Sequence, residues 1–286
     1  MQFGYLTHVT GDDPARAFRD TVELAVRAEQ LGFDSFWVAQ HRDGHLDGLL
    51  PSPLVLLAAV AERTRLIRLG TAVVALPLED PRRLAEDAAV LDALCGGRLE
   101  LGIGAGADAD ASRRFGRRYD DRHSDTLARL DILLELLPGD LAERVWWATG
   151  TSSSIDAAAA RGVGIVSGQP PGTGGVVPDL ARYWTYARGV PRVALSRPLA
   201  AGRTPEQLAD DLSADRALSW AGEVIVQAQP STAPAEVHRE VLERVARRIR
   251  PSLAPVTPTT ETVRSPRPAP RPVAQIGPAE AARTTR

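Results

Sequence analysis

Short apolar runs alternate with amphipathic helical patterns along this chain, and the alternation restricts the folds open to it. The apolar runs have the character of buried strands and lie at residues 3–7, 34–39, 67–75, 98–103, 144–149, 163–167, 192–199 and 222–227. Segments with helical spacing of apolar residues follow them, at residues 14–31, 53–63, 81–95, 123–137, 153–161, 178–188, 205–212 and 234–250. Eight strand–helix units in about 250 residues predict an α/β fold of the (β/α)8 TIM-barrel type with short loops.

The clearest unit covers residues 67–106. Its first apolar strand runs into Leu76-Pro77, after which Asp80 offers a helix N-cap and Pro81 occupies the first helical position. Gly96-Gly97 then stops the helix, and a second apolar strand follows. This punctuation predicts a complete β-α-β unit, because each boundary has its own local signal.

The composition excludes several classes of function. The 286 residues are 44% hydrophobic with a net charge of −2, which gives no reason to expect nucleic acid as a partner. No run of 18 apolar residues occurs, and the first residues lack a signal-peptide pattern, so we expect no membrane span and a cytoplasmic protein. Cys95 is the single cysteine, and all 34 basic residues are Arg, so a disulfide framework and a lysine Schiff base are both excluded.

The last part of the chain differs from the rest. Residues 251–286 contain eight of the 22 prolines and no aromatic side chain. Such a segment cannot bury enough apolar surface to offset its ordering entropy. We therefore predict one barrel domain at residues 1–250 and a disordered, mildly basic tail at 251–286.

Polar residues and glycines gather where the predicted strands end, which is where barrels place their active sites. These strand ends are Thr7-His8, Gln40-His41-Arg42, Leu76-Pro77, 104–106, 149–154, 167–169, Arg197 and 227–229. Histidine can act as acid, base or hydrogen-bond donor near neutral pH, which makes His41 the candidate catalytic residue. From their positions at strand ends we also expect Thr7 and Ser167 at the site. The five histidines are scattered without metal-ligand spacing, so no metal site is predicted.

Two glycine-containing turns, at residues 149–153 and 102–106, can be interpreted from the elements beside them. Thr149, Gly150, Thr151, Ser152 and Ser153 precede an alanine-rich helix, a pattern that fits a phosphate cradle or an ordinary N-cap with spare hydroxyls equally well. The GIGAG run at 102–106 does not open a helix, so it is no dinucleotide fingerprint. Close backbone packing beside a flat cofactor explains Gly104 better.

Several motifs resemble the luciferase-like flavin monooxygenases. The sequences LGTAV, P-x-R-x-A-E, L-D-x-L-x-x-G-R and LGIGxG follow one another in this order between residues 69 and 106, and FWVAQH at 36–41 is similar to a family strand that ends in a histidine at the flavin face. The family commonly has Glu where this chain has Gln40. The resemblance covers residues 1–250 and implies a barrel that binds reduced FMN and uses O2 to oxygenate a small organic substrate.

The resemblance also implies roles for particular residues. His41 would move a proton or stabilise the oxygen intermediate, and the turn from Thr149 to Ser153 would hold the flavin phosphate. Thr71, Ala72 and Val73 would pack on the isoalloxazine ring, in relatives sometimes through a non-proline cis bond. Some relatives have a phosphate-binding arginine where this chain has Ala105, which leaves Arg122 as the candidate, with Arg113 or Arg114 as substitutes.

Two alternative functions fit the same residues. A deazaflavin F420-dependent oxidoreductase would share the strand-end histidine, and a non-catalytic flavin-binding protein would share the fold. The substrate is expected to be a modest, uncharged molecule bounded by loops 42–50, 107–122 and 169–177. The resemblance further implies a homodimer and a separate flavin reductase as partner.

Overall fold

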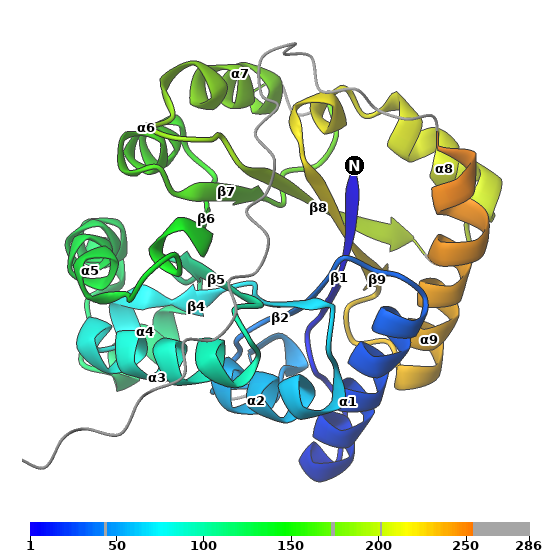
Figure 1. Ribbon diagram of the computed structural model, residues 1–286, viewed down its shortest axis with the longest axis horizontal. Helices are drawn as coiled ribbons and strands as arrows, with labels where there is room; N and C mark the ends of the chain where they lie inside the picture. The colour runs from blue at the N-terminus through cyan, green and yellow to red at the C-terminus, as the bar shows by residue number, and fades with distance from the viewer. Residues whose placement is uncertain (43–44, 173–174, 201, 254–286) are drawn as a thin grey trace, which may run out of the picture.

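The computed structural model describes residues 1–42, 45–172, 175–200 and 202–253. In this part of the chain all strands lie in one parallel sheet, ordered β3-β2-β1-β9-β8-β7-β6-β5-β4 and closed by a further β3–β5 pairing (Figure 1). The strand segments are β1 (Gln2–Thr7), β2 (Ser35–Val38), β3 (Arg68–Thr71), β4 (Val74–Ala75), β5 (Leu99–Gly104), β6 (Val145–Ala148), β7 (Gly164–Ser167), β8 (Val193–Ala200) and β9 (Glu223–Gln229). Since β3 and β4 are two pieces of one predicted strand, the predicted closed barrel of eight parallel strands is confirmed.

Helices surround the barrel as an outer ring (Figure 1). They are α1 (Pro14–Gln30), α2 (Pro53–Arg63), α3 (Pro81–Leu94), α4 (Ala109–Arg114), α5 (Arg122–Leu136), α6 (Ser152–Arg161), α7 (Val176–Tyr186), α8 (Pro205–Ala214) and α9 (Ala235–Arg244). All eight predicted helices are present, and α4 is an additional short helix in a segment expected to be a loop. Asp13 and Asp80 cap α1 and α3 as their sequences indicate, and Thr204 forms a full capping box on α8.

The predicted continuous strand at 67–75 is wrong in its middle, where the chain leaves the ladder at Ala72-Val73. The peptide bond between these two residues is cis. The Thr71 hydroxyl takes over the missing backbone pairing: it donates to the Gly102 carbonyl at 2.7 Å and accepts from the Gly102 amide at 2.9 Å. The seam of the barrel is therefore closed partly by a side chain, and β4 resumes the pairing at Val74.

Two tryptophans fill the barrel interior. Trp37 on β2 and Trp146 on β6 meet edge to face, with ring centroids 6.1 Å apart. Glycines on neighbouring strands make room for them: a Cβ on Gly70 would lie 2.1 Å from the Trp37 ring, and one on Gly164 would lie 2.7 Å from the Trp146 ring. These glycines are needed because a side chain at either position would collide with a large buried ring.

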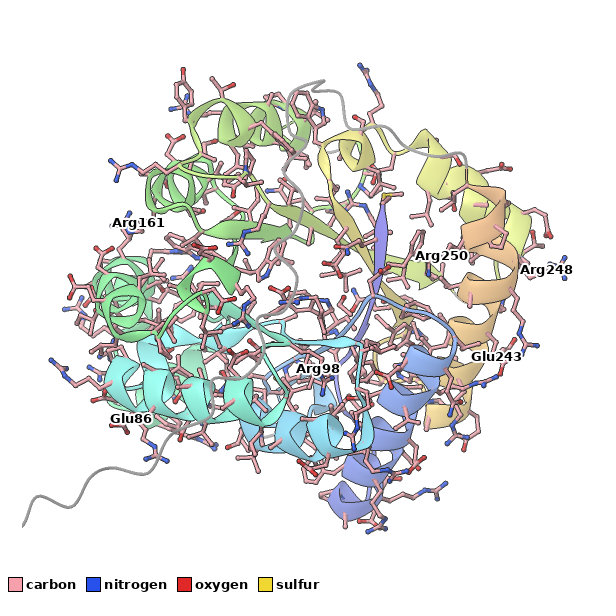
Figure 2. All side chains as sticks on the ribbon, viewed as in Figure 1. Glu86, Arg98, Arg161, Glu243, Arg248 and Arg250 are labelled. Carbon is pink, nitrogen blue, oxygen red and sulfur yellow. The ribbon has the colours of Figure 1, made fainter. Side chains whose placement is uncertain are left out.

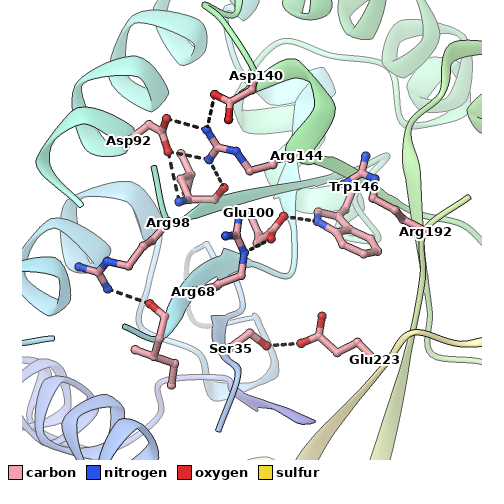
Figure 3. A network of polar contacts seen from close by, with 12 residues as sticks. Ser35, Arg68, Asp92, Arg98, Glu100, Asp140, Arg144, Trp146, Arg192 and Glu223 are labelled. Carbon is pink, nitrogen blue, oxygen red and sulfur yellow. Dashed lines mark hydrogen bonds and ion pairs between the residues drawn. The ribbon is translucent and has the colours of Figure 1, made fainter. Parts of the chain in front are cut away.

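Two buried carboxyl groups lie near the amino ends of their strands, Glu100 on β5 and Glu223 on β9 (Figure 3). Glu100 accepts hydrogen bonds from Arg68 and from the Trp146 indole nitrogen, the latter at 2.7 Å. Glu223 accepts one from the Ser35 hydroxyl, and burial raises its pKa to about 7. The amino end of the barrel therefore contains buried carboxyl groups, and each accepts hydrogen bonds from neighbouring side chains, as buried polar groups require.

The L-D-x-L-x-x-G-R motif also belongs to this amino end. Asp92 holds the Arg144 guanidinium with two hydrogen bonds of 2.7 and 2.8 Å (Figure 3). Arg98 donates to the carbonyls of Ala61 and Thr64 at the end of α2, among others. The motif thus joins helices to the strand that follows them, and its role in this chain is structural.

The outside of the helical ring is charged. Figure 2 shows Arg161, Glu243 and Arg248 pointing outward from it. At the end of the described chain, α9 continues as a π-helical turn at Val245–Ile249 and a 3-10 turn at Arg250–Ser252, and Leu253 packs on the core. Residues 254–286, most of the predicted tail, lie outside the described residues. None of the helices in the described ranges is long and apolar enough to cross a membrane.

Candidate active site at the carboxyl end of the barrel

The carboxyl ends of the parallel strands meet at one mouth of the barrel. His41 follows β2 and Thr149 follows β6, so the two sequence-predicted segments lie at the same end of the closed sheet. The interior residues beneath them are apolar and form one buried cluster with the tryptophans: Leu6, Ala39, Val166, Ala194 and Ile225, with Ala72 packed against it. This mouth therefore has a floor without charge and with several small side chains.

The imidazole of His41 is packed against Gly48 and His8 and is only 9% exposed. On one face, Gly48 approaches so closely that a Cβ there would lie 2.4 Å from the His41 ring. At its Nε2 edge, His41 meets the ring of His8 edge to edge, with the ring centroids 5.1 Å apart and His8 Nδ1 at 2.9 Å from His41 Nε2. The His41 amide also donates to the Leu50 carbonyl, so the loop after β2 folds back over this histidine.

His8 is a residue that sequence reasoning placed at a strand end but did not select. Its second ring nitrogen, Nε2, lies 3.0 Å from Gln227 Oε1 on β9. Burial lowers the pKa of His8, so the neutral ring is favoured. The alternation of β1 could have identified His8, because Leu6 faces the barrel interior and residue 8 has the same parity.

Gln40, the departure from the family pattern, has partners for both ends of its amide. Its oxygen accepts from the Ala75 amide at 2.8 Å, and its nitrogen donates to the Pro51 carbonyl at 2.9 Å and to the Glu79 carboxylate at 3.1 Å. A glutamate could not donate to either acceptor. Glutamine therefore suits this position because it links β4, the start of α2 and Glu79.

The turn from Thr149 to Ser153 contains one unsatisfied donor. Thr149 is 7% exposed, and its hydroxyl has no partner among the described residues. Thr151 instead caps α6, where it accepts from the Ser154 amide and contacts the Ser153 hydroxyl at 3.1 Å. The Ser152 hydroxyl donates to Asp179 at 2.9 Å. Buried polar groups normally have partners, so Thr149 is the hydroxyl of this turn that is best placed to bind a ligand.

Ala72 and Val73, which the resemblance assigns to the flavin ring, lie beside the interior cluster and Gly104. Ala72 packs on the interior cluster, and Val73 covers Gly104 so closely that a Cβ on this glycine would lie 2.7 Å from it. Thr71 is different, because its hydroxyl is fully engaged with Gly102 in the barrel seam. The structure therefore places Ala72, Val73 and Gly104 together at the mouth and gives Thr71 a structural role.

Three other expected residues lie elsewhere or are engaged with neighbours. Thr7 lines a groove of about 300 Å³ shared with residues of α1 and α9, on the outer side of β1, which corrects its expected place in the mouth. Ser167 has the outward parity on β7, and its hydroxyl accepts from the Gln169 amide at 3.4 Å. Arg122 stacks on Tyr119 at 3.9 Å and donates to the Tyr119 carbonyl. Thr7 and Ser167 point away from the barrel interior because successive side chains of a strand point to opposite faces of the sheet.

Comparisons with known proteins give the relatives of this chain. It is 35% identical over 243 residues to 4-hydroxyprotoasukamycin monooxygenase of Streptomyces nodosus subsp. asukaensis, covering 72% of this chain and 65% of that protein. It is 36% identical over 122 residues to an F420-dependent glucose-6-phosphate dehydrogenase of Amycolatopsis mediterranei, covering 42% of this chain and 36% of that protein. The chain spans less than two thirds of the length of these curated relatives.

A solved structure has the same fold. The oxygenating constituent of 3,6-diketocamphane monooxygenase from Pseudomonas putida, a type II Baeyer-Villiger monooxygenase in complex with FMN, superposes with a TM-score of 0.71 at 18% identity, covering 89% of this chain and 99% of that one. A family model described as luciferase-like monooxygenase matches residues 1–262. The chain therefore belongs to the luciferase-like monooxygenase family.

Proposed function

We propose that this protein is an FMN-dependent monooxygenase that uses reduced FMN and O2 to oxygenate a small organic substrate at the carboxyl end of its barrel. The observation that carries the proposal is the placement of a buried histidine and an unsatisfied buried hydroxyl, His41 and Thr149, at the same mouth over an uncharged floor. Family membership and the monooxygenase named among the relatives support it.

The residues at the mouth fit a flavin. Thr149 offers a hydroxyl without a protein partner among the described residues, and a Cβ at Gly150 would meet nothing within 4 Å in that part of the chain, so a phosphate can approach this turn. Ala72, Val73 and Gly104 supply the small apolar surface that a flat ring needs. Bound reduced FMN supplies the electrons that activate O2, which no side chain can do.

The protein's own residues then have two tasks. The apolar floor formed by Ala39, Ala72 and Val166 excludes water from the reacting face. His41, which is buried and held between His8 and Gly48, moves a proton to or from the reacting oxygen. The substrate itself is expected to be a small uncharged molecule, because the floor offers no charged partner.

An isosteric substitution tests the cofactor site. Thr149→Val removes the hydroxyl and should raise the Kd for FMN roughly 10-fold or more, since hydrogen bonds to charged groups contribute about 1.5–3 kcal/mol. Thr21→Val is the matched control, because Thr21 is equally buried but bonds to the Ala17 carbonyl within α1. Equal FMN affinity in both variants and the wild type would contradict the assignment of this turn.

F420 is the second candidate cofactor, because an F420-dependent dehydrogenase is among the relatives. Titration of the purified protein with FMN, reduced FMN and F420, followed by fluorescence, distinguishes the two cofactors. Oxygen consumption with reduced FMN and a panel of small uncharged substrates then distinguishes a monooxygenase from a non-catalytic flavin-binding protein. Oxygen uptake that does not depend on substrate or on His41 would refute the monooxygenase proposal.

We further propose a homodimer and a separate reductase that delivers reduced FMN. The dimer is supported by Val55 of α2 and by Val90 and Leu94 of α3, which are 73%, 62% and 56% exposed and line one groove of about 620 Å³. Val90→Asp should shift the mass measured by light scattering to that of a monomer. Leu66→Asp is the control, since Leu66 is 83% exposed outside this groove.

A further inference from the structure

Gln169, just after β7, connects the turn after β6 to a buried ion pair on β8. Its side-chain amide donates to the Gly150 carbonyl at 3.1 Å, and its own carbonyl accepts from Arg197 Nη1, also at 3.1 Å. Arg197 is 3% exposed, and its Nε donates to the Asp215 carboxylate at 2.6 Å. Gln169 is therefore held by β8 on one side and bonds to the turn on the other.

Two buried donors beside this link have no partner. The Thr149 hydroxyl and Arg197 Nη2 make no hydrogen bond among the described residues, and the two residues are 7% and 3% exposed. Both side chains lie on the helical side of the sheet, because they follow Trp147 and Leu195 of the strand–helix core by two residues. Buried donors normally have partners, so two unsatisfied ones on either side of β7 favour a ligand rich in acceptors.

The other hydroxyls of the turn are occupied, so its backbone amides matter for binding. The hydroxyls of Thr151 and Ser153 contact each other at 3.1 Å, and the Ser152 hydroxyl donates to Asp179 at 2.9 Å. The Asp179 carboxylate would also repel a phosphate that approached it. The remaining donors are the Thr149 hydroxyl and the first amides of α6, where the helix dipole favours an anion.

We propose that Gln169 is a positioning residue that presents the Thr151 amide to the cofactor phosphate, and that Arg197 holds Gln169 in place for this task. The peptide bond between Gly150 and Thr151 is trans, so its carbonyl and its N–H point in opposite directions. Because the Gly150 carbonyl is directed at Gln169, the Thr151 N–H points away from Gln169. Loss of this bond frees the peptide group to turn over and present its carbonyl, which repels a phosphate.

Arg197 makes this orientation rigid. Its guanidinium donates to the Asp215 carboxylate and to the carbonyls of Gln169 and Ser196, at 2.6, 3.1 and 2.8 Å. A planar guanidinium with these three acceptors has a fixed direction of donation, so the backbone of Gln169 is in place before a ligand arrives. A turn ordered in advance loses less conformational entropy on binding, which raises its affinity.

Gln169→Leu tests the orientation, because it removes the donor and keeps a side chain of similar size. The contribution of the phosphate is the ratio of the Kd for riboflavin, which lacks the phosphate, to the Kd for FMN, both oxidised. We expect Gln169→Leu to lower this ratio roughly 10-fold by weakening FMN alone, as the loss of one hydrogen bond to a charged group does. Gln207→Leu is the matched control, because Gln207 also bonds to a backbone group, the Thr204 amide at 3.0 Å, but in the capping box of α8.

The Thr151 amide proton gives a direct readout in the full chain. Its ¹H chemical shift should move downfield when FMN binds to the wild type, and it should not do so with riboflavin or in Gln169→Leu. Arg197→Gln combined with Asp215→Asn removes both buried charges together, so that neither is left unpaired. This double variant should lower the riboflavin-to-FMN ratio in the same direction as Gln169→Leu.

The inference rests on the proposed function, and the outcomes separate the two. A wild type that binds riboflavin and FMN equally well would overturn both. A wild type that prefers FMN, together with a Gln169→Leu variant of equal preference and equal Thr151 shift, would overturn the inference and leave the FMN site standing. A ratio that falls as much in Gln207→Leu would show a general structural effect and would also overturn the positioning role. An unchanged ratio in the folded double variant would overturn the part assigned to Arg197.

Discussion

The buried carboxyl group of Glu223 gives the sharpest prediction about stability. Glu223 is 6% exposed, and burial together with the nearby charge of Glu100 raises its pKa from 4.5 to about 7. Because the pKa of Glu223 is higher in the folded than in the unfolded state, its contribution to stability is fully present below pH 4.5 and is lost as pH rises through 7. The difference between the two pKa values corresponds to a loss of about 3 kcal/mol at high pH, because each pKa unit equals about 1.4 kcal/mol.

The substitution Glu223→Gln removes this dependence and keeps an oxygen that can accept from Ser35. We expect a gain of about 3 kcal/mol at pH 8, or roughly 10 °C in Tm for a domain of this size, and almost no gain at pH 4.5. Thermal unfolding of both proteins across this pH range measures it. Parallel Tm curves, with the same difference at pH 4.5 and pH 8, would refute the reasoning. Glu243→Gln is the control, because pairing with Arg27 lowers the pKa of Glu243 and should give the opposite sign.

Two further predictions concern the core. Gly70→Ala should lower the free energy of unfolding by about 1–3 kcal/mol in chemical denaturation, because its Cβ would lie 2.1 Å from the Trp37 ring. Gly168→Ala is the control: a Cβ there meets nothing within 4 Å in the described chain, so the free energy of unfolding should change by no more than about 0.5 kcal/mol. His238 hydrogen-bonds to the Tyr5 hydroxyl at 2.7 Å, and burial lowers the pKa of His238 from 6.5 to about 4. The free energy of unfolding of the wild type should therefore fall by up to about 3 kcal/mol as pH falls from 6.5 to 4. His238→Asn should flatten that loss, and an unchanged acid limb of the Tm profile would contradict it.

Local signals in the sequence predicted most of the fold. Helix starts such as Asp80-Pro81 carry their own capping chemistry, and the strands are apolar because the barrel covers both faces. These features depend on residues close together in the chain. The sequence alone therefore sufficed for the strand–helix order and for the end of the barrel at which His41 lies.

The features that sequence reasoning missed depend on contacts between distant segments. The break at Ala72-Val73 is compensated by Thr71 bonding to Gly102, about thirty residues away. The outward facing of Thr7 is the exception, because it follows locally from the alternation of β1, in which Leu6 points into the barrel. The pairing of His8 with His41 required knowing that β1 and β2 are neighbours with Thr7 opposite Val38.

The side-chain closure of the barrel seam at Thr71 makes the Gly102 amide proton a local reporter. Its protection from solvent exchange depends on one hydroxyl rotor, whereas the amides of the neighbouring ladder depend on backbone carbonyls. Deuterium uptake at this amide would therefore measure how often the barrel opens locally between β3 and β5, without unfolding elsewhere.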